Sequence, residues 1–254
     1  VASLTSEEVR SLEPRISSYV VEGIHVPSER QVDNRKLVEA LAERCRMRGV
    51  DLHEQEPVTD LEYSGNRIET IVSSEGTYRP DAVLICAGVG SSGIEGLKET
   101  DRMPVRPVKG EALSVQLDEP PEVEHVLRTP DVYCVPKSDG RLVIGGTMKE
   151  EGFDRRVTAG GVLDLLHEAY EVIPFIYENE LLETWAGLRP ASPDSLPILG
   201  PSSETENLIF ATGHYRNGIL LTPVTIQLIV DWFEEQANDP LEPFLPSRFQ
   251  ESCP

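Results

Sequence analysis

Arg189 stands in the segment AGLRPASPDSLPILG, directly between Leu188 and Pro190 and with apolar residues on both flanks. A guanidinium in such surroundings either pairs with an acid or binds an anionic ligand, because an unpaired charge is costly to bury. Its planar fork can hold a carboxylate through two parallel hydrogen bonds. Two interpretations therefore stay open: a clamp for an anion, and a structural ion pair with an acid such as Asp194.

A second chemical feature lies in FATGHYRNGILLTPVTIQLIV, where a strand ends at Gly213, a polar loop follows, and Gly218 opens an apolar helix. A helix start has unpaired N–H groups and roughly half a unit of positive charge, so it stabilises negative charge on a bound group. A reduced flavin, negative around its N1 and C2 carbonyl, suits such a site. The alternative is an ordinary strand–loop–helix junction. His214 beside Arg216 could suggest acid–base chemistry, but a lone histidine is more often a hydrogen-bonded structural group.

A third feature is the expected hairpin VYCVPKSDGRLVIGGTM, with Tyr133 on one strand and Met148 on the other. Both side chains could face one cavity. By residue type alone, both are core residues by default.

Gly88, Gly90 and Gly93 in AGVGSSG match the motif GxGxxG and follow the apolar strand DAVLICAG. A dinucleotide fingerprint also needs a helix that opens there and a second strand ending in an acid about 20 residues later. The next segment, IEGLKETDRMPVRP, offers at best one helical turn before Pro104. We therefore interpret these glycines as a tight strand exit that lets the backbone approach a cofactor.

Composition argues against several classes of protein. The formal net charge of −21 argues against nucleic acid or an anionic membrane as a partner. There is no run of about 18 apolar residues, no secretory signal, no GxSxG nucleophile motif and no histidine cluster at metal-ligand spacing. The scattered cysteines predict free thiols in a reducing compartment, with the cytoplasm as the default; they are Cys45, Cys86, Cys134 and Cys253.

The elements that must position these residues follow from periodicity and capping signals. Helices are expected over about residues 5–13, 33–48 and 158–173, and from Gly218 onward. Short strands are expected over 19–27 and 50–88, and an antiparallel block begins near Arg106. This order predicts an α+β protein in which an α/β domain and an antiparallel-sheet domain share a discontinuous chain. We expect the proline-rich tail from Asn238 to be loose.

Several of these segments in order resemble the glycine oxidase branch of the D-amino acid oxidase flavoproteins: VKGEALSV, VYCVP, GGTMK, WAGLRPASPDSLPILG and ATGHYRNGILL. The resemblance covers nearly the whole chain, and the spacings run uninterrupted from Tyr133 to Arg216. It implies an FAD-binding α/β domain interleaved with an antiparallel-sheet substrate domain that roofs the flavin. The FAD-binding domain would comprise residues 27–96 and 188–238, the substrate domain 1–26 and 97–187, and the tail 239–254.

The resemblance also implies roles for individual residues. Arg189 matches the arginine that holds the substrate carboxylate, and Tyr133 the tyrosine whose hydroxyl helps to hold it. Met148 matches a methionine that lines the small substrate cavity, and Arg216 an arginine beside flavin and substrate. The implied FAD contacts are a backbone position at the adenine, a strand exit near the phosphates and ribose, and a loop and helix start around the isoalloxazine. In chain order these are Val58, Cys86, Ala87, Gly88, Val89, Gly213, His214, Tyr215, Arg216, Asn217, Gly218, Ile219 and Leu220.

The chain departs from the resemblance in three places. Asp131 replaces a histidine expected near the pocket entrance, and Gly90 stands where a tryptophan is common. The N-terminal strand, GxGxxG and helix of the family precede the point where this sequence begins. Three explanations are open: a shortened chain, a partner chain that supplies the FAD segment, or a protein that no longer binds flavin. The intact loop over 213–218 favours the first two.

The implied reaction is FAD-dependent oxidative deamination of glycine or another small amino acid, connected with thiamine thiazole synthesis. Hydride passes from the substrate Cα to flavin N5, and O2 becomes H2O2. The alternatives are a D-amino acid dehydrogenase that passes electrons to a quinone, and a flavin-free carboxylate-binding or regulatory module. The expected partners are a small amino-acid substrate, further copies of this chain in a homo-oligomer, and the chain that would supply the N-terminal FAD segment.

Overall fold

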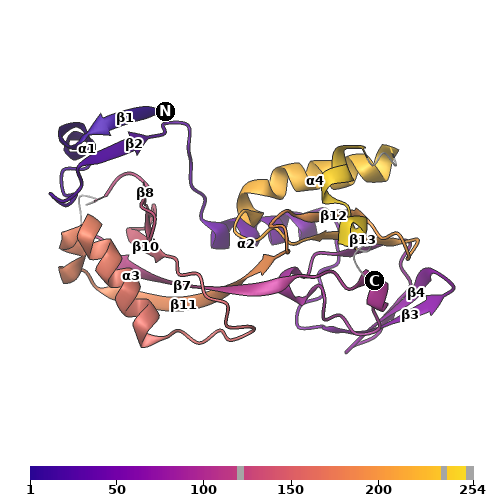
Figure 1. Cartoon of the computed structure of the whole chain (residues 1–254). Helices are drawn as coiled ribbons and strands as arrows, with labels where there is room; N and C mark the ends of the chain where they lie inside the picture. Colours follow the sequence, from indigo (N-terminus) through magenta and orange to yellow (C-terminus); the bar gives the residue numbers. More distant parts are fainter. Residues whose placement is uncertain (119–122, 236–238, 250–254) are drawn as a thin grey trace. The chain divides into compact units, whose positions relative to one another are not determined.

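The computed structural model describes residues 1–118, 123–235 and 239–249. The chain divides into two compact units (Figure 1). Unit 1 combines Val1–Leu41 with Lys109–Gly187, and unit 2 combines Ala42–Val108 with the chain from Leu188 on. The fold is α+β, and each unit is assembled from separated stretches of sequence.

The units divide the chain at 41/42, 108/109 and 187/188, whereas the domains expected from the sequence divide it at 26/27, 96/97 and 187/188. Asp33 forms an ion pair with Arg141, 3.2 Å apart, which ties the start of the second helix to unit 1. Met103 and Val105 are buried in the same core as Phe210, which ties their segment to unit 2. Tertiary contacts between residues far apart in sequence therefore set both boundaries.

Unit 1 is built on a five-stranded sheet with strand order β11-β7-β10-β9-β8. Strands β7, β10, β9 and β8 pair antiparallel in succession, and β9 and β10 form the expected hairpin. The bounds are β7 (Arg106–Gln116), β8 (Leu127–Arg128), β9 (Tyr133–Pro136), β10 (Arg141–Gly145) and β11 (Leu181–Ala191). A separate two-stranded ribbon, β1 (Ala2–Thr5) with β2 (Glu22–His25), accompanies the capped helix α1 (Ser6–Leu12).

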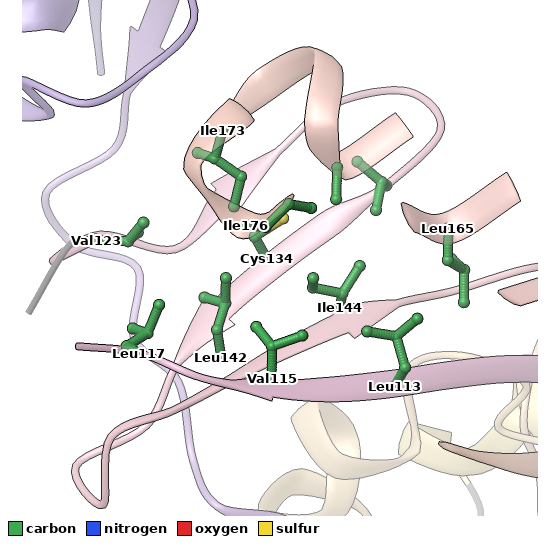
Figure 2. Packing of buried hydrophobic residues seen from close by; sticks show 12 residues of the cluster. Leu113, Val115, Leu117, Val123, Cys134, Leu142, Ile144, Leu165, Ile173 and Ile176 are labelled. Carbon is green, nitrogen blue, oxygen red and sulfur yellow. The ribbon is translucent and has the colours of Figure 1, made fainter. Parts of the chain in front are cut away.

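Helix α3 (Ala159–Val172) covers one face of this sheet. It begins where the Thr158 side chain accepts a hydrogen bond from Gly161 N–H, and it ends before the short 3-10 helix η3 (Pro174–Glu178). Leu165 of α3 packs in one cluster with Leu113 of β7 and Ile144 of β10 (Figure 2). Because side chains alternate along a strand, the Tyr133 side chain points to the opposite face, where its pairing partner Gly145 adds no side chain. The face that carries Tyr133 is therefore not part of this apolar cluster.

Unit 2 contains two three-stranded sheets, with orders β3-β4-β5 and β12-β13-β6. The first is antiparallel, with turns at Gly65 and Gly76. In the second, β13 pairs antiparallel with β12 and parallel with β6. The bounds are β3 (Val58–Ser64), β4 (Arg67–Ser73), β5 (Thr77–Tyr78), β6 (Val83–Ile85), β12 (Ile198–Pro201) and β13 (Leu208–Thr212).

Two long helices complete the framework. Helix α2 (Asn34–Met47) crosses the boundary between the units, and α4 (Gly218–Glu235) belongs to unit 2. Ile229 of α4 packs on Leu199 and Ile209 of the strands β12 and β13. Short 3-10 helices lie at η1 (Gly88–Gly90), η2 (Glu99–Asp101), η4 (Asp239–Phe244) and η5 (Pro246–Phe249). None of the helices in the described residues is long and apolar enough to cross a membrane.

The edge strand β6 is partly exposed, and the expectation of a loose tail was wrong. The strand β6 is only three residues long and covered on one face, since Ile85 is buried but its neighbour Leu84 is 43% exposed at the sheet edge. The tail over residues 239–249 is packed rather than loose. Leu241 is buried against Leu199, and the Arg248 guanidinium forms an ion pair with Asp194 at 2.8 Å.

Candidate active site

The parallel pair β6 and β13 places two strand exits side by side. Ile209 of β13 pairs with Leu84 of β6, so the carboxyl ends of both strands lie at the same edge of the sheet. Open α/β sheets bind their ligands at this edge. Thr212, the last residue of β13, is buried, and its hydroxyl donates to the Gly88 carbonyl at 3.2 Å. The Ser91 hydroxyl completes the link, 2.8 Å from that of Thr212. The exit over 86–91 and the loop after β13 are therefore joined directly.

The loop after β13 has a backbone conformation that few residues tolerate. Gly213 has φ +73°, and a Cβ there would lie 3.1 Å from the Ile198 side chain. Tyr215 also has positive φ, at 51°. The His214 ring bonds through Nε2 to the Thr225 hydroxyl of α4 at 2.9 Å, and burial lowers the pKa of His214. A neutral, hydrogen-bonded His214 fits the structural interpretation better than acid–base chemistry.

The start of α4 suits an electron-rich ligand. The helix begins at Gly218, as expected, and its first turn carries no acidic side chain that would neutralise the helix dipole. Ile219 and Leu220, whose N–H groups belong to this turn, are 48% and 78% exposed. These residues fit the flavin edge that the sequence predicts, since an accessible, positively polarised backbone is what a group gaining negative charge requires.

Arg189 lies on the strand segment that adjoins this loop. The Tyr215 N–H donates to the carbonyl of Pro190 at 2.8 Å, and Ala191 pairs with His214 in an antiparallel bridge. The alternative partner Asp194 is engaged elsewhere: the Arg248 guanidinium beside it lowers the pKa of that carboxyl. Asp194 is thus held by Arg248, and a carboxylate clamp at Arg189 stays a prediction.

Four further candidate residues, Arg216, Val58, Cys86 and Ala87, also lie in unit 2. Arg216 is exposed, and its guanidinium lies 5.9 Å from the centre of the Tyr215 ring. Val58, Cys86 and Ala87 line an apolar cavity of about 250 Å³ beside β6. The other lining residues are Leu61, Ile71, Val83, Leu84, Ile85 and Ile94. Unit 2 thus groups Val58 with the exit of β6, and that exit with the loop and α4.

The remaining two candidates belong to unit 1. Tyr133 is half-buried on β9, directly opposite Gly145 of β10. Met148 is 59% exposed and lies beyond β10, which ends at Gly145, so the prediction that it occupies a hairpin strand was wrong. Asp131 is exposed two residues before Tyr133, with its N–H donating to the Thr129 hydroxyl at 3.2 Å. That Tyr133 and Arg189 hold one carboxylate stays a prediction.

Sequence reasoning missed the residues that support these candidates. Thr212 joins the two strand exits, and a polar residue at the end of an apolar strand was the available signal. Gly145 gives the Tyr133 ring its place, and a glycine inside a strand often marks such a close approach. Gly90, by contrast, borders open space, because a Cβ added there would meet only the Cβ of Ala87, at 3.9 Å.

The linked ends of the parallel strands β6 and β13, followed by an accessible helix start, are typical of proteins that bind a nucleotide-type cofactor. Residues 1–232 match the DAO family of FAD dependent oxidoreductases, and the chain belongs to this family. It is 39% identical to the glycine oxidase of Geobacillus kaustophilus, over 95% of this chain and 64% of the relative. It is 34% identical to the bifunctional protein ThiO/ThiG of Synechocystis, over 98% of this chain and 38% of the relative.

A solved structure agrees with these similarities. The glycine oxidase of Bacillus cereus superposes with a TM-score of 0.90 at 33% identity, over 96% of this chain and 67% of the other. The chain thus spans less than two thirds of the length of the two relatives above and two thirds of this solved protein. The comparisons show the family and the fold. They leave the roles of single residues as predictions.

Proposed function

We propose that this protein takes part in the oxidative deamination of glycine or another small amino acid with FAD. The observation that carries the proposal is the joint between the exit of β6, the exit of β13 and the strand that bears Arg189. It joins the strand segment that bears Arg189 to the loop before the accessible helix start. The similarity to two glycine oxidases supports the choice of substrate class.

The candidate residues divide into those that would hold FAD and those that would hold the substrate. Val58 and the exit over 86–89 would hold the nucleotide part of FAD, and the loop over 213–220 would hold the isoalloxazine. When bound, FAD supplies the acceptor for the substrate hydride and the path of electrons to oxygen. Arg189 and Tyr133 would bind and orient the substrate carboxylate, with Met148 and Arg216 beside it. This chain's contribution to rate is then mainly positioning of the Cα–H.

The first test uses Arg189→Ala in the FAD-loaded protein. Loss of a charge-assisted pair costs about 1.5–3 kcal/mol, so kcat/KM for glycine should fall at least about tenfold. Arg156→Ala, at an exposed residue whose guanidinium pairs with Asp154, is the matched control and should leave kcat/KM unchanged. An unchanged kcat/KM in Arg189→Ala would exclude the clamp.

A visible spectrum and an electron-acceptor assay test the reaction itself. Bound flavin absorbs visible light, so a purified sample with that absorption supports the enzyme, whereas a colourless sample that rejects added FAD supports a flavin-free module. Peroxide formation with glycine distinguishes an oxidase from a dehydrogenase, which would reduce an artificial acceptor and produce no peroxide.

Unit 2 also has an edge suited to a further segment. The edge strand β6 exposes Leu84, although parallel strands are normally covered on both faces. We propose that this edge pairs with the strand–helix segment of the FAD site. Co-expression with the N-terminal segment of the Geobacillus kaustophilus glycine oxidase should increase the FAD retained per chain. Equal retention with and without that segment would refute this pairing.

The wider setting is proposed on the same similarities. A connection with thiamine thiazole synthesis is supported by the likeness to the protein named ThiO/ThiG. Three described cysteines are free, which supports the cytoplasm. A homo-oligomer is proposed as well, and sedimentation of the FAD-loaded protein would measure it.

A further inference from the structure

A buried network of charged residues lies on β7 of unit 1. Lys109 and Glu111 are at most 1% exposed on a strand whose next residues on the same face are apolar. The Lys109 ammonium lies 2.8 Å from a carboxylate oxygen of Glu151 and 3.7 Å from one of Glu111. Buried charges are destabilising unless they are paired, so these contacts require an explanation beyond core packing.

Glu111 connects three parts of the unit. Its carboxylate accepts hydrogen bonds from the Lys149 ammonium at 2.9 Å, and from the N–H and hydroxyl of Thr158 at 2.7 and 3.0 Å. Thr158 is the N-cap of α3. Gly161 leaves room for the carboxylate, because a Cβ there would overlap both of its oxygens. One side chain therefore joins β7, the segment after β10 and the start of α3.

The two sequence neighbours of Met148, Thr147 and Lys149, are both held by contacts to β7. Lys149 exchanges two backbone hydrogen bonds with Lys109, at 2.8 and 3.0 Å. On the other side, the Thr147 hydroxyl accepts the N–H of Glu111 at 2.9 Å. Alternation along this short paired stretch directs Thr147 and Lys149 toward Glu111 and Met148 toward the opposite face, the face of Tyr133.

We propose that Glu111 is a positioning residue that holds Met148 in place and thereby limits the size of the substrate side chain. The inference rests on the proposed function for the role of Met148, but the contacts of Glu111 do not depend on it. A purely structural glutamate would stabilise the unit without changing the preference between small and larger substrates.

Two variants separate the parts of the network. Glu111→Gln keeps an oxygen for Thr158 but sets an amide against the Lys149 ammonium, and Lys149→Met removes that partner alone. Backbone amide exchange in the peptide around 147–151 should become at least about tenfold faster in both variants. Exchange in the β10 peptide, residues 141–145, should stay within about twofold of the parent. Lys149→Arg keeps the charge and should retain most of the protection.

The second measurement uses FAD-loaded protein with glycine and with a small D-amino acid. The ratio of their kcat/KM values should shift at least about threefold in Glu111→Gln, mainly through KM. Asp164→Asn, at an exposed residue of α3, is the control. Unchanged exchange and an unchanged ratio would overturn the inference. If exchange rises but neither Glu111→Gln nor Met148→Ala moves the ratio, the proposed role of Met148 fails and Glu111 is only structural.

Discussion

The pair of Gly145 and Tyr133 allows a test of how the proposed substrate face is built. The two residues are direct partners in the antiparallel register of β9 and β10. The Tyr133 ring lies across the glycine: a Cβ at Gly145 would be 2.8 Å from Cε2 and would overlap Cζ and the hydroxyl oxygen. Contacts this short are not tolerated. Gly145→Ala must therefore displace either the ring or the strand.

The magnitude follows from the size of this overlap. Adding a methyl group to a filled site costs typically about 1–3 kcal/mol, because neighbouring side chains leave their preferred rotamers. If the ring moves, the hydroxyl would lose the hydrogen bond that we propose it makes to the substrate carboxylate, worth about 1.5–3 kcal/mol. Since about 1.4 kcal/mol corresponds to a tenfold change in an equilibrium constant, KM for glycine should rise at least about tenfold in the FAD-loaded protein.

A double-mutant cycle distinguishes ring displacement from general damage. Tyr133→Ala removes the obstacle, so adding Gly145→Ala to it should lower the melting temperature much less than Gly145→Ala does in the parent. Gly160→Ala is the control, since a Cβ at that helical glycine meets nothing within 4 Å. Equal destabilisation by Gly145→Ala with and without the Tyr133 ring would refute this reasoning, as would an unchanged KM.

Two other predictions concern stability. Arg248→Met removes the ion pair with Asp194 and the guanidinium bonds to carbonyls over 196–197, so it should lower the melting temperature by about 4–8 °C. A shift below about 1 °C, like that expected for Arg156→Met, would contradict it. Burial alone would raise the pKa of Glu111, but hydrogen bonds from Lys149 and Thr158 lower it from its ordinary value of 4.5 to about 2. The depressed pKa stabilises the fold above about pH 4.5, and this contribution is lost as the pH falls toward 2. The difference in unfolding free energy between the parent and Glu111→Gln, measured with urea, should therefore shrink over that range, and a constant difference would exclude this linkage.

Local signals in the sequence were enough to predict the helices. Thr158 caps α3 and Pro174 follows its end, while Gly218 opens α4 after a polar loop. Each of these signals acts within a few residues, so no knowledge of the tertiary structure is needed. The boundaries between the units could not be predicted from local signals. They depend on Asp33 meeting Arg141 and on Met103 meeting Phe210, contacts that span more than a hundred residues.

The candidate site divides in the same way. The exit after β6 and the loop after β13 could be predicted, because glycine-rich turns after apolar strands have a recognisable composition. Their direct joint through Thr212 could not, since the threonine resembles any other polar residue at a strand end. Met148 was placed on the wrong element for a related reason. Its position depends on pairing with β7, which the hairpin pattern does not contain.

The two units position their candidate residues by different means. In unit 2 the candidate site is formed mainly by the backbone. Positive φ at Gly213 and Tyr215 shapes the loop, and the α4 dipole provides partial positive charge at the helix start. In unit 1 the proposed substrate face depends on side chains, with Tyr133 seated over a glycine and Met148 next to residues that the Glu111 network holds. A backbone site tolerates many side chains and suits a cofactor common to a family. A side-chain site changes with single substitutions, so differences in substrate among relatives should arise on the face of unit 1.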